Sequence, residues 1–166
     1  MSFSESISSV FSKYATFSGR ARRSEFWYFY LFQLIISLGL TFLSRWDSNF
    51  KYIQIVFGLA IFVPYMAVTV RRLHDIGKSG WTLLWFMVPW FLIIMLLTLF
   101  VTIITTSVTD LSTLMIIIVY GIFILLFLVI SIWLIVWLAR DSQPGENQWG
   151  PNPKEQPETP LDNNIE

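Results

Sequence analysis

Residues 114–138 read LMIIIVYGIFILLFLVISIWLIVWL, a run without a single charged side chain. A helix of about 20 residues crosses the roughly 30 Å hydrocarbon core of a bilayer, so this stretch is long enough to span one. Three further charge-free stretches precede it, at residues 26–43, 52–70 and 83–104. Because lipid offers the backbone no hydrogen-bond partner and these stretches lack the alternation of barrel strands, all four are predicted to be helices.

The composition agrees with a membrane location. Of the 166 residues, 55% are hydrophobic and only 13% are charged, and the mean hydropathy is +0.62. Soluble domains carry about a quarter charged residues, so this chain has too few to cover a soluble fold. The sequence therefore predicts an all-α polytopic membrane protein with a four-transmembrane-helix bundle. The expected parts are a cytoplasmic amphipathic and basic segment (1–25), a transmembrane domain (26–138) and a cytoplasmic tail (139–166).

The two ends differ from the spans. Between Phe3 and Tyr14, apolar residues recur at helical spacing, which predicts a short amphipathic helix in the membrane interface; a frayed terminus is the alternative. The tail is rich in Pro, Gly, Asn, Gln and acidic residues, and its distal part, from Lys154 onward, is predicted to be disordered. Residues 105–113 contain Asp110 and are predicted to form a turn exposed to water.

Orientation follows from the distribution of lysine and arginine. Nine bases fall in the N-terminal segment, the middle loop and the tail: Lys13, Arg20, Arg22, Arg23, Arg71, Arg72, Lys78, Arg140 and Lys154. Only two, Arg45 and Lys51, fall in the loop between the first two spans. Basic loops stay in the cytoplasm, so both termini and the middle loop are predicted to be cytoplasmic. Inside the second and third spans, Pro64 and Pro89 each remove a backbone donor.

Several kinds of site are not expected. The chain has no cysteine and one histidine, which excludes thiolate sites and multi-histidine metal motifs. The GKS at residues 77–79 lacks the glycine that a phosphate-binding loop needs five residues earlier. We therefore expect no metal, no cofactor, no catalytic residue and no nucleic-acid partner.

Three motifs carry a family resemblance. The runs FSGRARRSEFWYFYLF, VRRLHDIGKSGW and PGENQWGPNPK occur in this order between residues 17 and 154. The chain resembles the domain of unknown function 805 family, the YhaH-type bacterial inner-membrane proteins. The resemblance implies a small, multi-pass protein of the bacterial cytoplasmic membrane, and it implies no established activity.

The chain departs from the shorter family members in one respect. They have one helix-length apolar segment between the motif tryptophan and the tail, whereas residues 81–138 hold enough for two spans here. Either the short members fold that segment as a re-entrant hairpin or their tails lie on the opposite side. The charge count favours a cytoplasmic tail in this chain.

A polar patch is the one candidate for a binding function. Because the first two spans form a hairpin and the middle loop follows it, the first two motifs are predicted to meet at the inner membrane face. Glu25 and Asp75 are expected to form structural ion pairs with arginines there. The candidate binding residues for an anionic headgroup or a partner are Arg20, Arg22, Arg23, Arg71, Arg72, His74, Trp27 and Trp81.

The patch supports three classes of function. The favoured one is a non-catalytic protein that organises or binds a partner. That partner is anionic lipid, another membrane protein or a second copy of this chain. The first alternative is a small transporter or channel component. Since no span contains an ionisable residue, its polar path would have to use Ser37, Thr41, Thr98 and the backbone near Pro64 and Pro89. The second is a membrane-bound enzyme that uses His74 and Asp75. Arginines that serve only to fix orientation are the simplest explanation of the patch.

Overall fold

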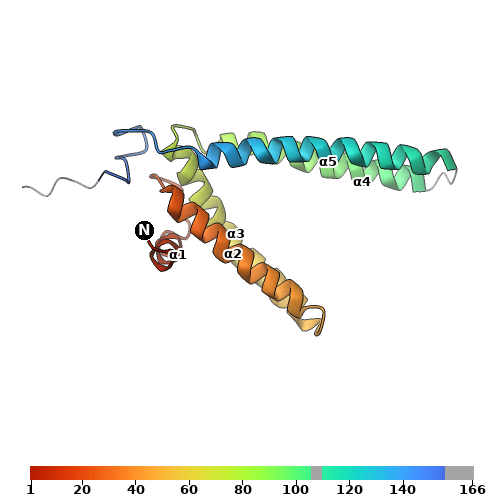
Figure 1. The fold of residues 1–166 in the computed structure, drawn as a ribbon, viewed down its shortest axis with the longest axis horizontal. Helices are drawn as coiled ribbons and strands as arrows, with labels where there is room; N and C mark the ends of the chain where they lie inside the picture. Colours follow the sequence, from red (N-terminus) through yellow and green to blue (C-terminus); the bar gives the residue numbers. More distant parts are fainter. Residues whose placement is uncertain (106–109, 156–166) are drawn as a thin grey trace, which may run out of the picture. The chain divides into compact units, whose positions relative to one another are not determined.

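The computed structural model describes residues 1–105 and 110–155, which form helices joined by turns and loops (Figure 1). Five helices follow one another along the chain: α1 (Phe3–Ser12), α2 (Arg23–Leu43), α3 (Asn49–Asp75), α4 (Thr82–Thr105) and α5 (Asp110–Ala139). The last four are long and apolar enough to cross a membrane. The predicted all-α polytopic fold with an additional N-terminal helix is confirmed.

The helices extend beyond the charge-free stretches from which they were predicted. α2 already begins at Arg23, and α3 continues through its charged last turn to Asp75. Ion pairs inside the protein, described below, allow charged residues to continue both helices. Of the predicted turn at 105–113, residues 106–109 lie outside the described residues, and α5 begins at Asp110.

The chain folds into two compact units. The first contains Met1–Lys78 together with the tail from Asp141, and the second contains Ser79–Arg140. The first unit is therefore assembled from two separate pieces of sequence, because the chain leaves it after Lys78 and returns at Asp141.

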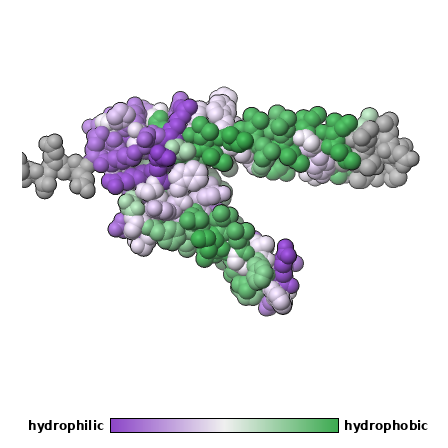
Figure 2. Space-filling model, viewed as in Figure 1, coloured by the Kyte–Doolittle hydropathy of each residue, from purple (hydrophilic) through white to green (hydrophobic). Residues whose placement is uncertain are grey.

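In the first unit, α2 and α3 form an antiparallel hairpin and lie side by side (Figure 1). A hydrogen bond of 3.2 Å from Gln54 Nε2 to Thr41 Oγ1 joins them near the connecting turn. Figure 2 shows apolar surface along the hairpin and polar surface at its two ends. This distribution suits helices that span lipid with their ends in water.

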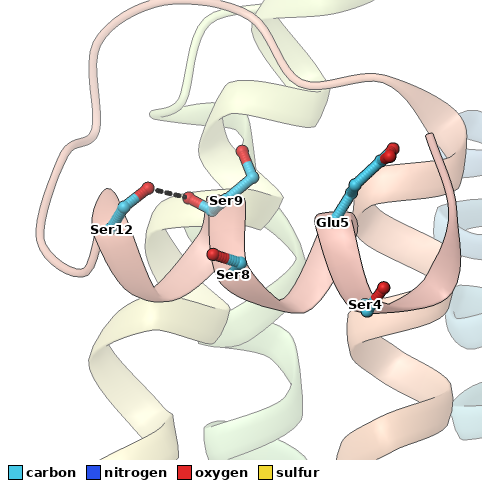
Figure 3. Close-up of a pocket in the computed structure, with 5 residues that line it drawn as sticks. All are labelled: Ser4, Glu5, Ser8, Ser9 and Ser12. Atoms are coloured by element: carbon cyan, nitrogen blue, oxygen red, sulfur yellow. Dashed lines mark hydrogen bonds between the residues drawn. The ribbon is translucent and has the colours of Figure 1, made fainter.

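α1 packs on α2 with its apolar side. Ser2 and Glu5 form a capping box at its start, with Ser2 Oγ accepting from the Glu5 amide and the Glu5 carboxylate accepting from the Ser2 amide. The rings of Phe11 and Phe29 lie edge to face with their centroids 5.6 Å apart. Figure 3 shows the serine-rich side of α1, which lines an open pocket. There the hydroxyl of Ser12 donates to the carbonyl of Ser9. The amphipathic helix therefore uses part of its apolar face to contact the hairpin.

A proline in α3 explains how the segment after α1 is attached. Pro64 has no N–H, so the carbonyl of Ala60 one turn earlier lacks its helical donor. The hydroxyl of Tyr14 donates to that carbonyl over 2.5 Å. The proline thus creates an acceptor on the side of α3 at the point where the N-terminal segment crosses it.

Gly77 ends α3 in a Schellman motif. The amide of Lys78 donates to the carbonyl of Leu73, and the amide of Gly77 donates to that of His74. Gly77 has a φ of +75°, which is strained for other residues, and a Cβ there would lie 2.6 Å from Oε1 of Gln143. The tail therefore passes close to the turn that ends α3.

The second unit is a hairpin of α4 and α5 joined by aromatic contacts. The rings of Trp90 and Phe127 are 3.7 Å apart, and Phe86 lies edge to face with Trp133 and Trp137 at 5.6 Å from each. Most apolar side chains that the structure describes on these helices face outward. Figure 2 shows this apolar surface, which is suited to lipid.

Candidate functional site

The charged end of the α2–α3 hairpin contains a buried cluster of ion pairs. The antiparallel packing brings the first turn of α2 against the last two turns of α3. Arg71 Nη2 donates to Glu25 Oε1 at 3.3 Å, and both side chains are at most 4% exposed. Ser9 Oγ of α1 donates to the same carboxylate oxygen at 3.2 Å. All three helices of the unit therefore meet at Glu25.

Arg71 also holds the segment that follows α1. Its Nη1 donates to the carbonyl oxygens of Lys13 at 3.1 Å and of Thr16 at 2.9 Å. Its Nε is buried and has no protein partner. One guanidinium thus joins α3 to the carboxylate at the start of α2 and to the backbone between α1 and α2.

Asp75 is the second anionic centre and is completely buried. Arg20 Nε donates to Oδ1 at 3.0 Å, while Arg72 and Ser142 donate to Oδ2, the latter at 2.6 Å. Arg72 lies one helical turn before Asp75, whereas Arg20 comes from the loop before α2 and Ser142 from the tail. A carboxylate disfavoured by the negative end of the α3 dipole is thus stabilised by charge-assisted hydrogen bonds.

Arg20 binds the tail through main-chain oxygens. Its Nη2 donates to the carbonyl of Gln143 at 2.5 Å, and its Nη1 donates to those of Gly145 at 2.7 Å and Gly150 at 3.3 Å. The amide of Gln143 donates in turn to the carbonyl of Asp75 at 2.8 Å. The tail therefore completes the cluster and is fixed to the end of α3.

His74 lies under the tail and is 7% exposed. Its Nδ1 is 3.1 Å from the carbonyl oxygen of Gly19, and because that oxygen only accepts, Nδ1 carries the proton of this hydrogen bond. Its ring stacks on Trp149 with centroids 4.5 Å apart and planes 8° from parallel. The backbone carbonyl of His74 accepts from Asn147 Nδ2 at 3.0 Å.

Asn147 organises the tail loop itself. Its Oδ1 accepts from the amide of Trp149, and its backbone pairs with Gly150 in an isolated antiparallel bridge. A second, exposed connection lies beside it, where Asp141 accepts from Lys154 at 2.6 Å and from Arg23 at 3.3 Å. These two hydrogen bonds lower the pKa of Asp141.

The structure brings together some of the predicted site residues and separates others. Arg20, Arg71, Arg72, His74, Glu25 and Asp75 converge in the cluster, where the arginine head groups face acids and carbonyls of the protein. Arg22 is half-buried, and Arg23 is exposed beside Asp141. Trp27 is half-buried against Phe26 and Tyr30. Trp81 belongs to the second unit and is 76% exposed.

Sequence reasoning missed the contribution of Ser9, Ser142, Gln143, Asn147 and Trp149. The composition of the tail predicts disorder only from Lys154 onward, and no periodic pattern in residues 139–153 predicts where that part of the tail lies. The available signal was Trp149 in the run NQWG at residues 147–150, since an aromatic ring in a polar tail favours a docked loop. Within the described residues, no group of three or more metal-ligating acids and histidines comes together.

The energetics of the cluster follow from its charges. Three buried arginines face two buried carboxylates, so positive charge exceeds negative charge within the cluster. Breaking a buried pair by removing one partner costs about 3 to 5 kcal/mol, because the other charge stays buried without compensation. Loss of either carboxylate therefore leaves a buried arginine without a negatively charged partner.

Comparison with known proteins identifies the family. A profile described as "Protein of unknown function (DUF805)" matches residues 14–151. Inner membrane protein YhaH of Escherichia coli K12 is 29% identical over 155 residues, which cover 89% of this chain and 95% of that protein. Inner membrane protein YhaI of the same strain is 40% identical over 91 residues, 52% of this chain and 77% of that protein. No solved structure is significantly similar. The match includes the ion-pair cluster and the loop that covers it, and this chain belongs to the DUF805 family.

Proposed function

We propose that this chain is a non-catalytic, multi-pass protein of the bacterial cytoplasmic membrane that binds anionic lipid at its cytoplasmic face. Two relatives are named inner membrane proteins, which supports the location. The binding surface that we propose is a basic rim, defined here as Lys13 and Arg22 with the neighbouring aromatic residues Tyr14 and Phe17. Arg71 of the buried cluster holds the backbone of this rim, because it donates to the carbonyls of Lys13 and Thr16.

The observation that carries the proposal is the exposure of bases and aromatic rings in one short segment. Lys13 is exposed and Arg22 is half-exposed, and Arg22 forms no ion pair within the described part of the chain. Tyr14 and Phe17 are 40% and 45% exposed. Aromatic rings favour headgroup depth, and each base near an anionic surface adds about 1 kcal/mol of attraction. Lipid phosphate is the ligand that both features favour.

The contacts of the other candidate residues favour this function over its alternatives. Both carboxylate oxygens of Asp75 and Nδ1 of His74 are engaged in hydrogen bonds, which disfavours an acid-base pair. The hydroxyls of Thr41 and Thr98 donate to carbonyls of their own helices at 2.8 Å, which disfavours a polar transport path along them.

Thermal unfolding in detergent with added lipid tests the proposal. We expect phosphatidylglycerol and cardiolipin to raise the unfolding temperature more than phosphatidylethanolamine does. A Lys13→Gln, Arg22→Gln variant should lose that preference but keep its unfolding temperature without lipid. The matched control, Arg45→Gln with Lys51→Gln, changes two exposed bases at the opposite end of the hairpin and should keep the preference. Equal effects of all three lipids on the parent would refute lipid binding through the rim.

The orientation rests on two observations. The excess of bases lies on the side of the N-terminal segment, the middle loop and the tail. The tail docks on Arg20 and on the end of α3, so these three segments share one side of the membrane. A reporter fused after Glu166 should be active only if it works in the cytoplasm, and one inserted near Asp110 should behave oppositely. Alkaline phosphatase activity from the first fusion would overturn the orientation.

A further inference from the structure

The surface that holds the tail has the properties of a peptide-binding site. It consists of Arg20, His74 and Asp75, and we call it the tail site. Its ligand is the segment from Ser142 to Gly150. Arg20 donates to three main-chain carbonyls of this segment, at distances between 2.5 and 3.3 Å. The carbonyl of Asp75 accepts from a main-chain amide of the segment at 2.8 Å. Recognition of an extended backbone by main-chain hydrogen bonds is typical of peptide binding.

Two side chains add sequence selectivity to these backbone contacts. Trp149 stacks on His74 with nearly parallel rings, and Asn147 donates to the His74 carbonyl. Asn147 also shapes the segment by its bridge to Gly150. Gly145 and Gly150 have φ values of +67° and +121°, which favour glycine. The site therefore requires asparagine, tryptophan and glycine at fixed positions.

The segment docks from outside and carries its own turn. Gln143, Glu146 and Gln148 are exposed, so one face of the segment meets solvent while the other contacts the tail site. The Asn147–Gly150 bridge forms within the segment. A loop that is already organised loses less entropy on binding than an unstructured peptide does. This arrangement allows the segment to bind without a covalent link to the rest of the unit.

We propose that the tail site is a peptide-recognition site, which binds the chain's own tail in cis and the tail of a second copy in trans. In cis, the linked tail has an effective concentration on the order of millimolar, so it competes strongly with any free segment. Exchange between two copies becomes favourable when the cis tail is weakened. The site thus provides a route to association of two copies through their tails.

A fluorescent peptide with the sequence of residues 141–155 tests the proposal by anisotropy in mild detergent. The full-length parent should bind it weakly. A full-length Asn147→Ala, Trp149→Ala variant, whose own tail is weakened, should bind it at least about tenfold more tightly because the competitor is lost. A control peptide that carries the same two substitutions should bind neither protein.

The unfolding transition of the variant shows whether it is folded. If the variant does not fold, the same measurement is made on the parent with millimolar peptide. The native peptide should then bind the parent better than the control peptide does, because only the native sequence can displace the chain's own tail. Arg20→Gln in the parent should remove this difference. Equal binding of both peptides, or failure of the native peptide to bind a folded variant, would overturn the proposal.

Discussion

Replacement of Asp75 by asparagine is the sharpest test of the buried cluster. The side chain keeps its size but loses its charge, and three donors from Arg20, Arg72 and Ser142 lose an ionic acceptor. The three buried arginines then face one carboxylate, that of Glu25. We expect a loss of about 3 to 5 kcal/mol of stability, since buried charge is left uncompensated. For a chain of this size that corresponds to a fall in unfolding temperature on the order of 10 °C.

The measurement is thermal unfolding in one mild detergent, followed by tryptophan fluorescence. Glu146→Gln is the matched control, because it also turns an acid into an amide and its side chain is exposed in the same unit. A double-mutant cycle with Arg20→Gln adds a second criterion: the two changes together should cost less than their sum by about 1 to 3 kcal/mol. An unfolding temperature for Asp75→Asn within about 2 °C of the control would refute the proposed energetics.

Three smaller predictions use the same unfolding assay. Tyr14→Phe should cost about 0.5 to 1.5 kcal/mol, because the exposed hydrogen bond to the Ala60 carbonyl is lost, whereas Tyr28→Phe should have little effect; equal effects would contradict this role. Because the pKa of Asp141 is lowered in the folded state, its ionised side chain stabilises the fold at pH above the unfolded pKa of about 3.9. This stability is lost as pH falls through the lower folded pKa. The unfolding temperature of Asp141→Asn should therefore depend less steeply on pH in acid than that of the parent. Gly77→Ala should cost about 1 to 2 kcal/mol through its left-handed backbone, since the glutamine that a Cβ would meet can move away.

The spans were predictable because lipid imposes a simple rule on composition. A charge-free stretch of sufficient length must form a helix there, and the stretches at 26–43 and 52–70 lie within α2 and α3. Their ends were not predictable by the same rule. Glu25 and Arg71 look like the limits of the spans, yet they continue the helices because each neutralises the other. Hydropathy counts each charge alone and contains no information about pairs.

The meeting of the two motifs was predictable, and Glu25 pairs with Arg71 across them, but the exact partners of Asp75 were predictable only where they are local. Arg72 lies one turn before Asp75, so helix geometry alone suggested that contact. The Arg20 contact depends on a loop of irregular backbone, and no periodic pattern describes it. The tail is a third case. Lys154 was expected to begin a disordered region, yet it bonds to Asp141, and residues 156–166 lie outside the described residues.

The tail site also constrains how often the chain can cross the membrane. The chain leaves the first unit at Lys78 and returns to it at Asp141, where the tail binds Arg20. An even number of crossings must therefore connect these two points, and the α4–α5 hairpin supplies two. A single crossing would place the tail on the opposite side and leave the buried Arg20 without its carbonyl partners. Because such a loss is costly for a buried charge, docking of the tail opposes every topology in which α4 and α5 do not return to the same side.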